Sequence, residues 1–243
     1  MTVGDIYNVI DSFAPFSSQM EFDNAGILIG NRETPVKKIM VCLDVSLSAV
    51  REAKEKGCDL IVSHHPLIFS PLYNIDSGST EAFLIRNNIS LISAHTNIDA
   101  SEKGTNAYLC EILGLQNVQQ EGLLFKGELK EALLSEEFLK LVKNEIKTEK
   151  MRYVNPKRVK TVAICSGSGG DLLKDTAGSD CFITGDVKHN VFIEAKNNGQ
   201  MLIDAGHFET EWIFVKRFAE ILKATTNIEV LVSETEERPF EIY

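Results

Sequence analysis

The stretch Lys38-Ile39-Met40-Val41-Cys42-Leu43-Asp44, followed after a helix-like segment by Gly57-Cys58-Asp59-Leu60-Ile61-Val62-Ser63-His64-His65, decides the fold. Both apolar runs are typical of buried strands, and residues 48–56 between them have the pattern of an amphipathic helix. A strand, a helix and a second strand predict a parallel sheet covered by helices. Ligands bind such sheets beyond the carboxyl ends of the strands, which is where His64 and His65 stand.

The second half of the chain repeats this plan. Asp59 and Asp180 each precede a second strand, and His64-His65 and Gly185-Asp186 each follow one. The matching segments are 38–44 with 159–165, 57–65 with 179–186, and 87–95 with 197–207, and helices are expected at 104–113, 171–175 and 210–223. We therefore predict an α/β fold of two similar halves, an internal duplication with mostly parallel sheets and a metal site in the cleft between the halves.

The expected boundaries follow from the repeat. Residues 1–115 form the first α/β half, residues 116–158 a short connector, and residues 159–243 the second half, together making one compact unit. Within the connector, residues 121–134 suggest a hairpin, and Ser135 precedes a helix with an apolar stripe.

Composition narrows the class of protein. The chain has 243 residues, 44% of them hydrophobic, and a formal charge of −10. This net negative charge argues against a general nucleic-acid binder, but it does not exclude a local basic patch on the surface. No signal peptide or membrane span is apparent, and the five cysteines form no CxxC pair. A reduced, cytoplasmic protein is the simplest interpretation.

All five histidines lie in three segments that follow apolar runs: 63–66, 94–99 and 185–211. Imidazoles and carboxylates at strand ends are the donors that a transition-metal site needs. Adjacent strand residues point to opposite faces, so His64 and His65 reach one site only where the strand ends, before Pro66. Loop histidines satisfied by backbone hydrogen bonds are the alternative.

His207 and Glu211 are four residues apart, so a helix starting near His207 places both on one face. The helix dipole alone accounts for an acidic residue there, but not for His207. Asp99 has two interpretations, a metal ligand or a capping box with Glu102. His95 lies four residues earlier and has three possible roles: a metal ligand, a hydrogen-bond partner of a metal ligand, or an acid/base group.

A glycine-rich run, Ser166-Gly167-Ser168-Gly169-Gly170-Asp171, follows one predicted strand. Its amides fit either a phosphate cradle or a plain tight turn, because the run lacks the Lys-Ser/Thr ending of a P-loop.

These motifs together resemble the Nif-three (NGG-one interacting factor three-like) family, whose members are often labelled GTP cyclohydrolase I type 2 homologs. The matching motifs occur in family order over nearly the whole chain: Asp23-Asn24-x-Gly26 with Gly30, Ser63-His64-His65-Pro66, Ala94-His95-Thr96-Asn97-Ile98-Asp99, Thr184-Gly185-Asp186 and Gly206-His207-x3-Glu211. The resemblance implies paired α/β halves in a toroidal homohexamer and two divalent metal ions per chain. The implied ligands are His64, His65, Asp99, His207 and Glu211.

Two departures from the family pattern concern basic residues. The family's Gly-Arg-x-Gly pattern is replaced here by Phe125-Lys126-Gly127, so Lys126 is the residue expected to keep a basic contact. Many members carry a histidine where Asn190 aligns, whereas this chain has His189 one residue earlier.

The resemblance implies a dinuclear metal-dependent hydrolase, with opening of the GTP purine ring as the specific activity. His95 is the candidate for proton transfer. The substrate is expected to be a small molecule, with nucleotides among the candidates. Alternatives are a phosphoester or nucleotide hydrolase and a metal-binding regulatory or scaffold ring without turnover. Histidine and carboxylate ligands admit Zn, Fe, Mn, Ni or Co.

Overall fold

The computed structural model describes residues 1–236 and 238–241. The chain forms two compact units: unit 1 contains residues 1–98 and 215–243, and unit 2 contains residues 99–214. The structure thus places the expected connector, residues 116–158, within unit 2. It places the chain from Val215 onward with the first residues of the chain, in unit 1.

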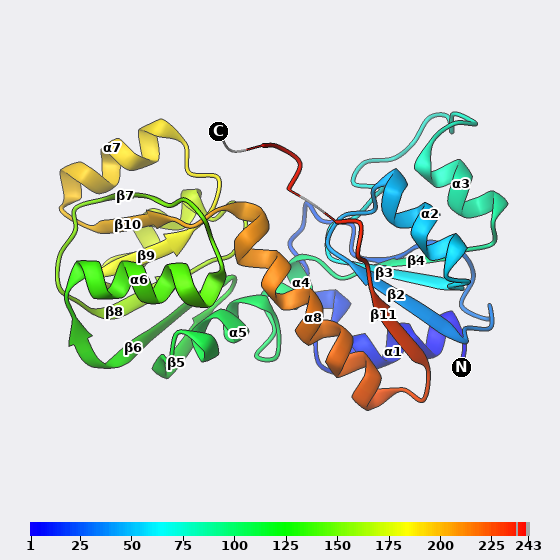
Figure 1. Cartoon of the computed structure of the whole chain (residues 1–243), viewed down its shortest axis with the longest axis horizontal. Coiled ribbons are helices and arrows are strands. Elements are labelled where there is room, and N and C mark those ends of the chain that lie inside the picture. Colours follow the sequence, from blue (N-terminus) through cyan, green and yellow to red (C-terminus); the bar gives the residue numbers. More distant parts are fainter. Residues whose placement is uncertain (237, 242–243) are drawn as a thin grey trace. The chain divides into compact units, whose positions relative to one another are not determined.

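Unit 1 is built on a five-stranded sheet of order β1-β4-β3-β2-β11. Its strands are β1 (Gly26–Ile29), β2 (Lys38–Cys42), β3 (Leu60–Ser63), β4 (Ser90–Ser93) and β11 (Glu229–Val232). Only the edge strand β1 is antiparallel to its neighbour. The helical elements of the unit are α1 (Val3–Asp11), η1 (Phe16–Ser18), α2 (Leu47–Glu55) and α3 (Thr80–Arg86), and Figure 1 shows α2 and α3 together on one side of the sheet.

Unit 2 has a six-stranded sheet of order β5-β6-β8-β9-β10-β7. Its strands are β5 (Gln116–Glu121), β6 (Leu124–Leu133), β7 (Arg152–Val154), β8 (Val159–Ile164), β9 (Cys181–Thr184) and β10 (Met201–Asp204). Its helical elements are α5 (Thr105–Ile112), α6 (Ser135–Ile146), η2 (Gly170–Thr176) and α7 (His189–Asn198). Two further helices lie at the unit boundaries, α4 (Thr96–Asp99) and α8 (His207–Thr225).

Both sheets are mixed, so the expectation of mostly parallel sheets holds for unit 1 but not for unit 2. In unit 2, β8, β9 and β10 are parallel, while β5, β6 and β7 join antiparallel. All three antiparallel strands come from the connector, and β5 and β6 form the predicted hairpin. A tight turn joins antiparallel strands only, which explains the antiparallel pairing of β5 with β6.

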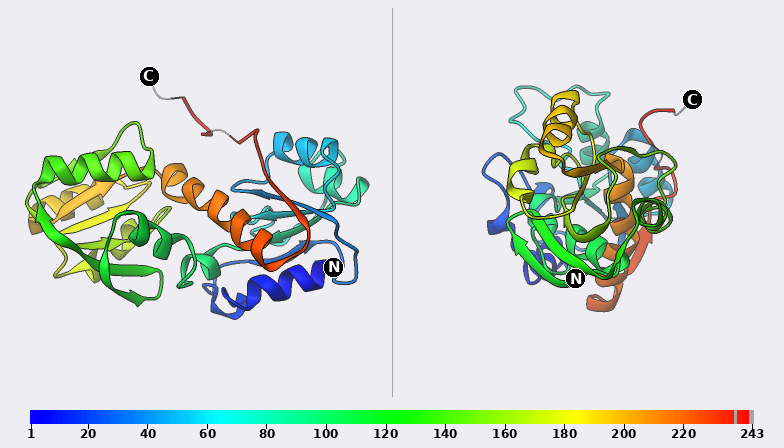
Figure 2. Two further views of the ribbon diagram at one scale, coloured as in Figure 1. Left: turned by 60° about the horizontal axis from the view of Figure 1, so that its bottom comes forward. Right: turned by 90° about the vertical axis from the view of Figure 1, so that its left-hand side faces the viewer.

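Alternating side chains along the parallel strands of unit 2 supply two separate cores. Val162, Ile183 and Ile203 pack with α5 and α6 on one face. Ala163 and Phe182 pack with η2 and α7 on the other face. Burial on both faces explains why these strands read as continuous apolar runs. Figure 2 shows the backbone from two further sides.

Asp59 and Asp180 have the same structural role in their own units. The Asp59 carboxylate accepts hydrogen bonds from the amides of Lys37 and Lys38 at 2.8 and 3.1 Å. The Asp180 carboxylate accepts from the amides of Lys160 and Thr161, both at 2.9 Å. Each aspartate therefore fixes the start of the strand before its own.

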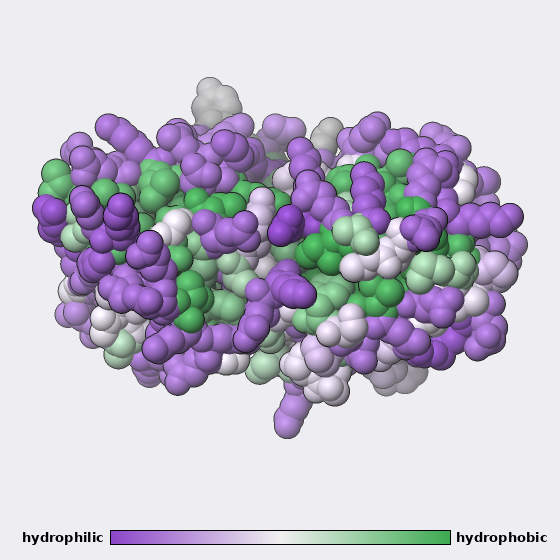
Figure 3. All heavy atoms as spheres, turned by 90° about the horizontal axis from the view of Figure 1, so that it is seen from below, coloured by the Kyte–Doolittle hydropathy of each residue, from purple (hydrophilic) through white to green (hydrophobic). Residues whose placement is uncertain are grey.

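The surface carries many hydrophilic side chains with hydrophobic ones between them, as the face drawn in Figure 3 shows. Within the described residues, the helices are all too short or too polar to cross a membrane. All five cysteines are buried and unbridged.

A buried carboxylate ties the end of the described chain into unit 1. Glu52 of α2 is 6% exposed, and it accepts hydrogen bonds from Lys56 Nζ at 2.8 Å and Ser233 Oγ at 2.7 Å. The amides of Glu234 and Thr235 donate to it at 3.1 and 3.3 Å. Burial alone would raise the pKa of Glu52, but these hydrogen bonds lower it from 4.5 to about 2.

We predict that Glu52→Gln removes up to about 3 kcal/mol of unfolding free energy at neutral pH. A depressed folded-state pKa stabilises above the unfolded value of 4.5, and that stability is lost as the pH falls toward about 2. Urea unfolding between pH 7 and pH 2 measures the difference. Glu55→Gln, on the exposed face of the same helix, is the matched control; equal stability of the two variants at pH 7 would contradict the prediction.

Candidate metal centre

Three histidines of unit 1 meet beyond the carboxyl ends of β3 and β4. His64 and His65 follow β3 directly, and His95 follows β4. Their ring centroids are separated by 5.0 to 5.6 Å, and one nitrogen of each lies within 4.8 Å of the others. His64 is buried, and the other two rings are half-buried. Strand ends thus bring together imidazoles that are 30 residues apart in sequence.

Each of these rings is held through Nδ1. His64 Nδ1 lies 3.1 Å from the carbonyl oxygen of Ala94, and because a carbonyl only accepts, Nδ1 carries the hydrogen. His65 Nδ1 donates to Asp44 Oδ1 and His95 Nδ1 to Asp23 Oδ1, both at 2.9 Å. The lone pair of each neutral imidazole is then on Nε2, the arrangement found in histidines that bind metals.

The carboxylate of Asp23 is firmly ionised. Burial alone would raise its pKa, but hydrogen bonds from His95 and Thr96 lower it to about 2. The Thr96 amide donates to Asp23 Oδ2 at 3.0 Å, and the Thr96 hydroxyl donates to the same oxygen. Asp23 therefore orients His95 and fixes the start of α4 at the same time.

In unit 2, helix α8 begins at His207, three residues before the expected range of 210–223 and at the start that a shared face for His207 and Glu211 requires. His207 Nε2 lies 3.0 Å from Glu211 Oε2, so both residues share the face that the spacing predicted. His207 Nδ1 lies 2.7 Å from Asp186 Oδ2, which gives this ring the same kind of carboxylate partner as His65 and His95. Asp186 has a positive φ of 49°, an unusual backbone for a residue other than glycine.

Asp99 also lies in unit 2, at the end of α4. The next helix, α5, has Gly104 as its N-cap, so the capping-box alternative for Asp99 and Glu102 is wrong. Asp99 is 7% exposed and its Oδ1 lies 3.5 Å from Ser166 Oγ. Burial, together with the charges of Asp99 and Glu211, raises the pKa of the Cys165 thiol. Two buried carboxylates beside one thiol suit a site that holds a cation.

Three amides of the glycine-rich run of residues 166–171 are already used. The amides of Ser166, Gly167 and Gly169 donate to Asn106, Thr210 and Thr184 side chains at 2.7, 3.0 and 2.9 Å. A phosphate cradle would need these groups to face a ligand. The turn instead lies against the candidate ligands, because a Cβ on Gly167 would collide with Glu211 Oε1.

Lys126 and His189, the two departures from the family pattern, are not among the candidate metal ligands. Lys126 forms a 2.8 Å ion pair with Glu121 across the β5–β6 hairpin. His189 is exposed at the start of α7, and it belongs to none of the potential metal-binding groups found among the described residues.

The sequence patterns did not predict that Asp44 and Asp186 orient the rings of His65 and His207. Asp44 and Asp186 each stand just beyond a strand, like the histidines themselves, and that position was the available signal. Which carboxylate faces which imidazole depends on loop geometry, which local sequence does not encode.

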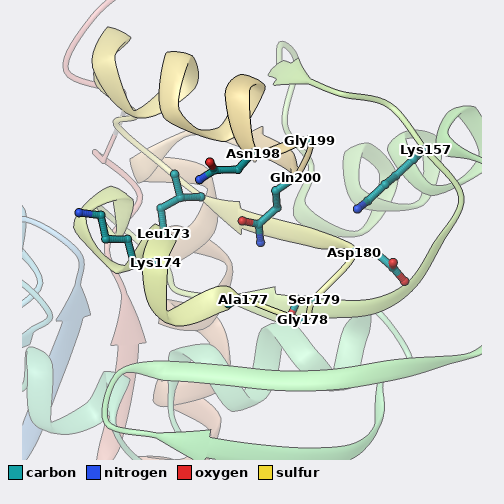
Figure 4. A pocket seen from close by; sticks show the side chains of 10 residues that line it. All are labelled: Lys157, Leu173, Lys174, Ala177, Gly178, Ser179, Asp180, Asn198, Gly199 and Gln200. Atoms are coloured by element: carbon teal, nitrogen blue, oxygen red, sulfur yellow. The ribbon is translucent and has the colours of Figure 1, made fainter.

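A separate hollow of about 510 Å³ lies in unit 2, between η2 and the ends of β9 and β10 that point away from His207 (Figure 4). Its lining residues are Lys157, Leu173, Lys174, Ala177, Gly178, Ser179, Asp180, Asn198, Gly199 and Gln200. None of them is a predicted donor, and Asp180 and Gln200 already hydrogen-bond within the unit. This hollow is therefore separate from the candidate metal centre.

Residues 1–239 match the family model Duf34/NIF3 (NGG1p interacting factor 3). A protein of Clostridium perfringens called "GTP cyclohydrolase 1 type 2 homolog" is 35% identical over 99% of both chains. One of Campylobacter jejuni with the same description is 36% identical over the whole of both. Among solved structures, Staphylococcus aureus protein SA1388 has a TM-score of 0.93 at 27% identity, covering 100% of this chain and 99% of that one. Reduced HcgD from Methanocaldococcus jannaschii has a TM-score of 0.87 at 32% identity, covering 96% and 98%.

Proposed function

Because this chain belongs to the Duf34/NIF3 family, we propose that it is a dinuclear metal-dependent hydrolase. The observation that carries the proposal is the shared mode of holding the rings. Two of the proposed ligands, His65 and His207, direct Nδ1 at an aspartate, a partnership that metal-binding histidines commonly have. The donor set of imidazoles and carboxylates fits two divalent ions of Zn, Fe, Mn, Ni or Co.

Five residues would hold the ions: His64, His65, Asp99, His207 and Glu211. We propose that donors of the two units serve one centre in the cleft between two duplicated halves. The equivalent roles of Asp59 and Asp180 support the duplication. Bound divalent ions would supply an acidified water and polarise the substrate.

His95 is the proposed proton-transfer group. Its Nδ1 is fixed by the ionised Asp23, so its Nε2 is the atom that takes or gives a proton at the substrate. A histidine with such a partner can serve as a general base and then as a general acid.

The substrate proposed first is GTP, with hydrolytic opening of its purine ring, because relatives are described as GTP cyclohydrolase 1 type 2 homologs. A phosphoester or nucleotide hydrolase would need the same donor set. We also propose that the protein assembles as a toroidal homohexamer. We further propose that it works in the reducing cytoplasm, and the five unbridged cysteines support this location.

Turnover of GTP before and after metal removal tests the proposed function. The parent is expected to consume GTP when loaded with metal, to lose activity after chelation and to regain it on reloading. His95→Gln should keep its metal while losing most of the turnover. A parent that is fully loaded but turns over neither GTP nor a panel of nucleotides and phosphoesters would favour a regulatory metal-binding ring instead.

Asp186→Asn is predicted to weaken metal binding by roughly ten- to a hundredfold, because the Asp186 charge no longer polarises the His207 ring. Asparagine tolerates the left-handed backbone at this position, so the fold should persist. Competitive titration with a chromogenic chelator measures the affinity. Asp171→Asn makes the same charge change on an exposed residue of unit 2 and is the control. If Asp186→Asn bound metal as tightly as the parent, Asp186 would have no role in metal binding.

A further inference from the structure

Two loops of unit 1 expose an unusual share of large hydrophobic side chains. The loops are residues 20–24 and residues 66–78, before α3. The exposed side chains are Met20, Phe22, Phe69, Leu72, Tyr73 and Ile75, at 40% to 102% exposure. Apolar groups gathered in this way mark binding sites more often than chance does.

The turn that carries Phe22 is built with defined hydrogen bonds. The Met20 amide donates to Thr96 Oγ1 at 2.9 Å, and Gln19 and Ala25 exchange hydrogen bonds at 2.7 and 3.3 Å across the turn. Asn24 Nδ2 donates to the carbonyl oxygen of Ile68 at 2.6 Å, which ties the two loops together. These hydrogen bonds define the backbone of the turn that carries Phe22.

The two phenylalanine rings continue directly from the histidine cluster. The Phe69 centroid lies 6.4 Å from the ring of His95 and 6.3 Å from the ring of Phe22. Phe22 is 60% exposed and Phe69 is 48% exposed. Centroid separations of this size are typical of aromatic contacts, and the exposed parts of both rings can accept a further ring.

We propose that Phe22 and Phe69 bind the planar ring of a heteroaromatic substrate beside His95. The proposal rests on the proposed function, since His95 is the group that would meet the reacting part of that substrate. Aromatic faces bind bases by stacking without reading their hydrogen-bond pattern, so these residues select for a ring and not for one base. The adjacent His95, oriented by Asp23, then determines which position of the substrate ring exchanges a proton with the protein.

Binding of guanosine, compared with ribose, which has no base, tests this inference by saturation-transfer NMR and equilibrium dialysis. Both metal-loaded and metal-stripped protein are used, so that ring binding is measured without turnover. Phe22→Ala and Phe69→Ala should each weaken guanosine binding roughly ten- to a hundredfold. Phe69→Leu, which keeps apolar volume but lacks a π face, should weaken it nearly as much. Ile85→Ala removes a 50% exposed apolar side chain of α3 and should leave it unchanged.

Unchanged guanosine binding in both phenylalanine variants would overturn the inference, as would a parent that binds guanosine no better than ribose. If the variants bind guanosine normally but their mass by light scattering falls, the loops contact a second copy of this chain, and the inference is wrong. If ring binding depends on Phe22 and Phe69 while loaded protein shows no turnover, the inference stands and the hydrolase proposal fails.

Discussion

Gly185→Ala is expected to lower the unfolding free energy by about 3 kcal/mol or more. Gly185 follows β9, and a Cβ there would lie 2.6 Å from the amide nitrogen of His207 and 2.7 Å from the carbonyl carbon of Gly206. The carbonyl oxygen of Gly167, which accepts the Gly185 amide at 2.7 Å, would be 2.8 Å away. All three neighbours are backbone atoms, so the start of α8 has to move.

Urea unfolding of unliganded protein measures this loss. Gly170→Ala is the matched control, because its nearest neighbours are Val191 methyl groups at 3.7 and 3.8 Å and its φ is not positive. The control should retain nearly all of the parent's stability. A Gly185→Ala protein as stable as the control would mean that the β9–α8 junction is more adaptable than its contacts indicate.

Gly167→Ala is expected to abolish tight metal binding while the protein stays folded. The added Cβ collides with Glu211 Oε1 and would lie 3.4 Å from His207 Nε2. The obstacle is the end of a flexible side chain, so Glu211 swings away and the backbone need not move. With φ at 61°, alanine adds a left-handed strain of about 1–2 kcal/mol.

Gly114→Ala separates that strain from the displacement of Glu211. Gly114 has a φ of 68° in the same unit, and a Cβ there meets nothing within 4 Å. Both variants should therefore lose similar stability, but only Gly167→Ala should lose metal in equilibrium dialysis. Equal metal affinity in the two variants would show that Glu211 is not a ligand.

The parallel core and the chemistry at its strand ends could be predicted from local pattern. Continuous apolar runs before His64, His95 and Gly185 correspond to β3, β4 and β9, because strands buried on both faces read in this way. The spacing of His207 and Glu211 placed both on one helical face, as observed. These features depend on residues that are close together in the sequence.

Long-range pairing could not be predicted in the same way. β11 pairs with β2 in register Glu229 to Lys38, although nothing near either strand in the sequence points to the other. The antiparallel pairing of β6 with β8 likewise depends on how the connector folds back. The aspartate partners of His65 and His207 come from loops 21 residues away, and only the folded backbone brings them together.

Elemental analysis of the parent beside the double variant His64→Ala, Glu211→Ala tests the central claim most directly. Each protein is sized by light scattering, so that loss of metal can be told from loss of assembly. The account predicts about two divalent metal ions per chain in the parent and almost none in an intact, folded variant. Equal metal content in the two proteins would contradict it and would return these histidines and carboxylates to a purely structural role.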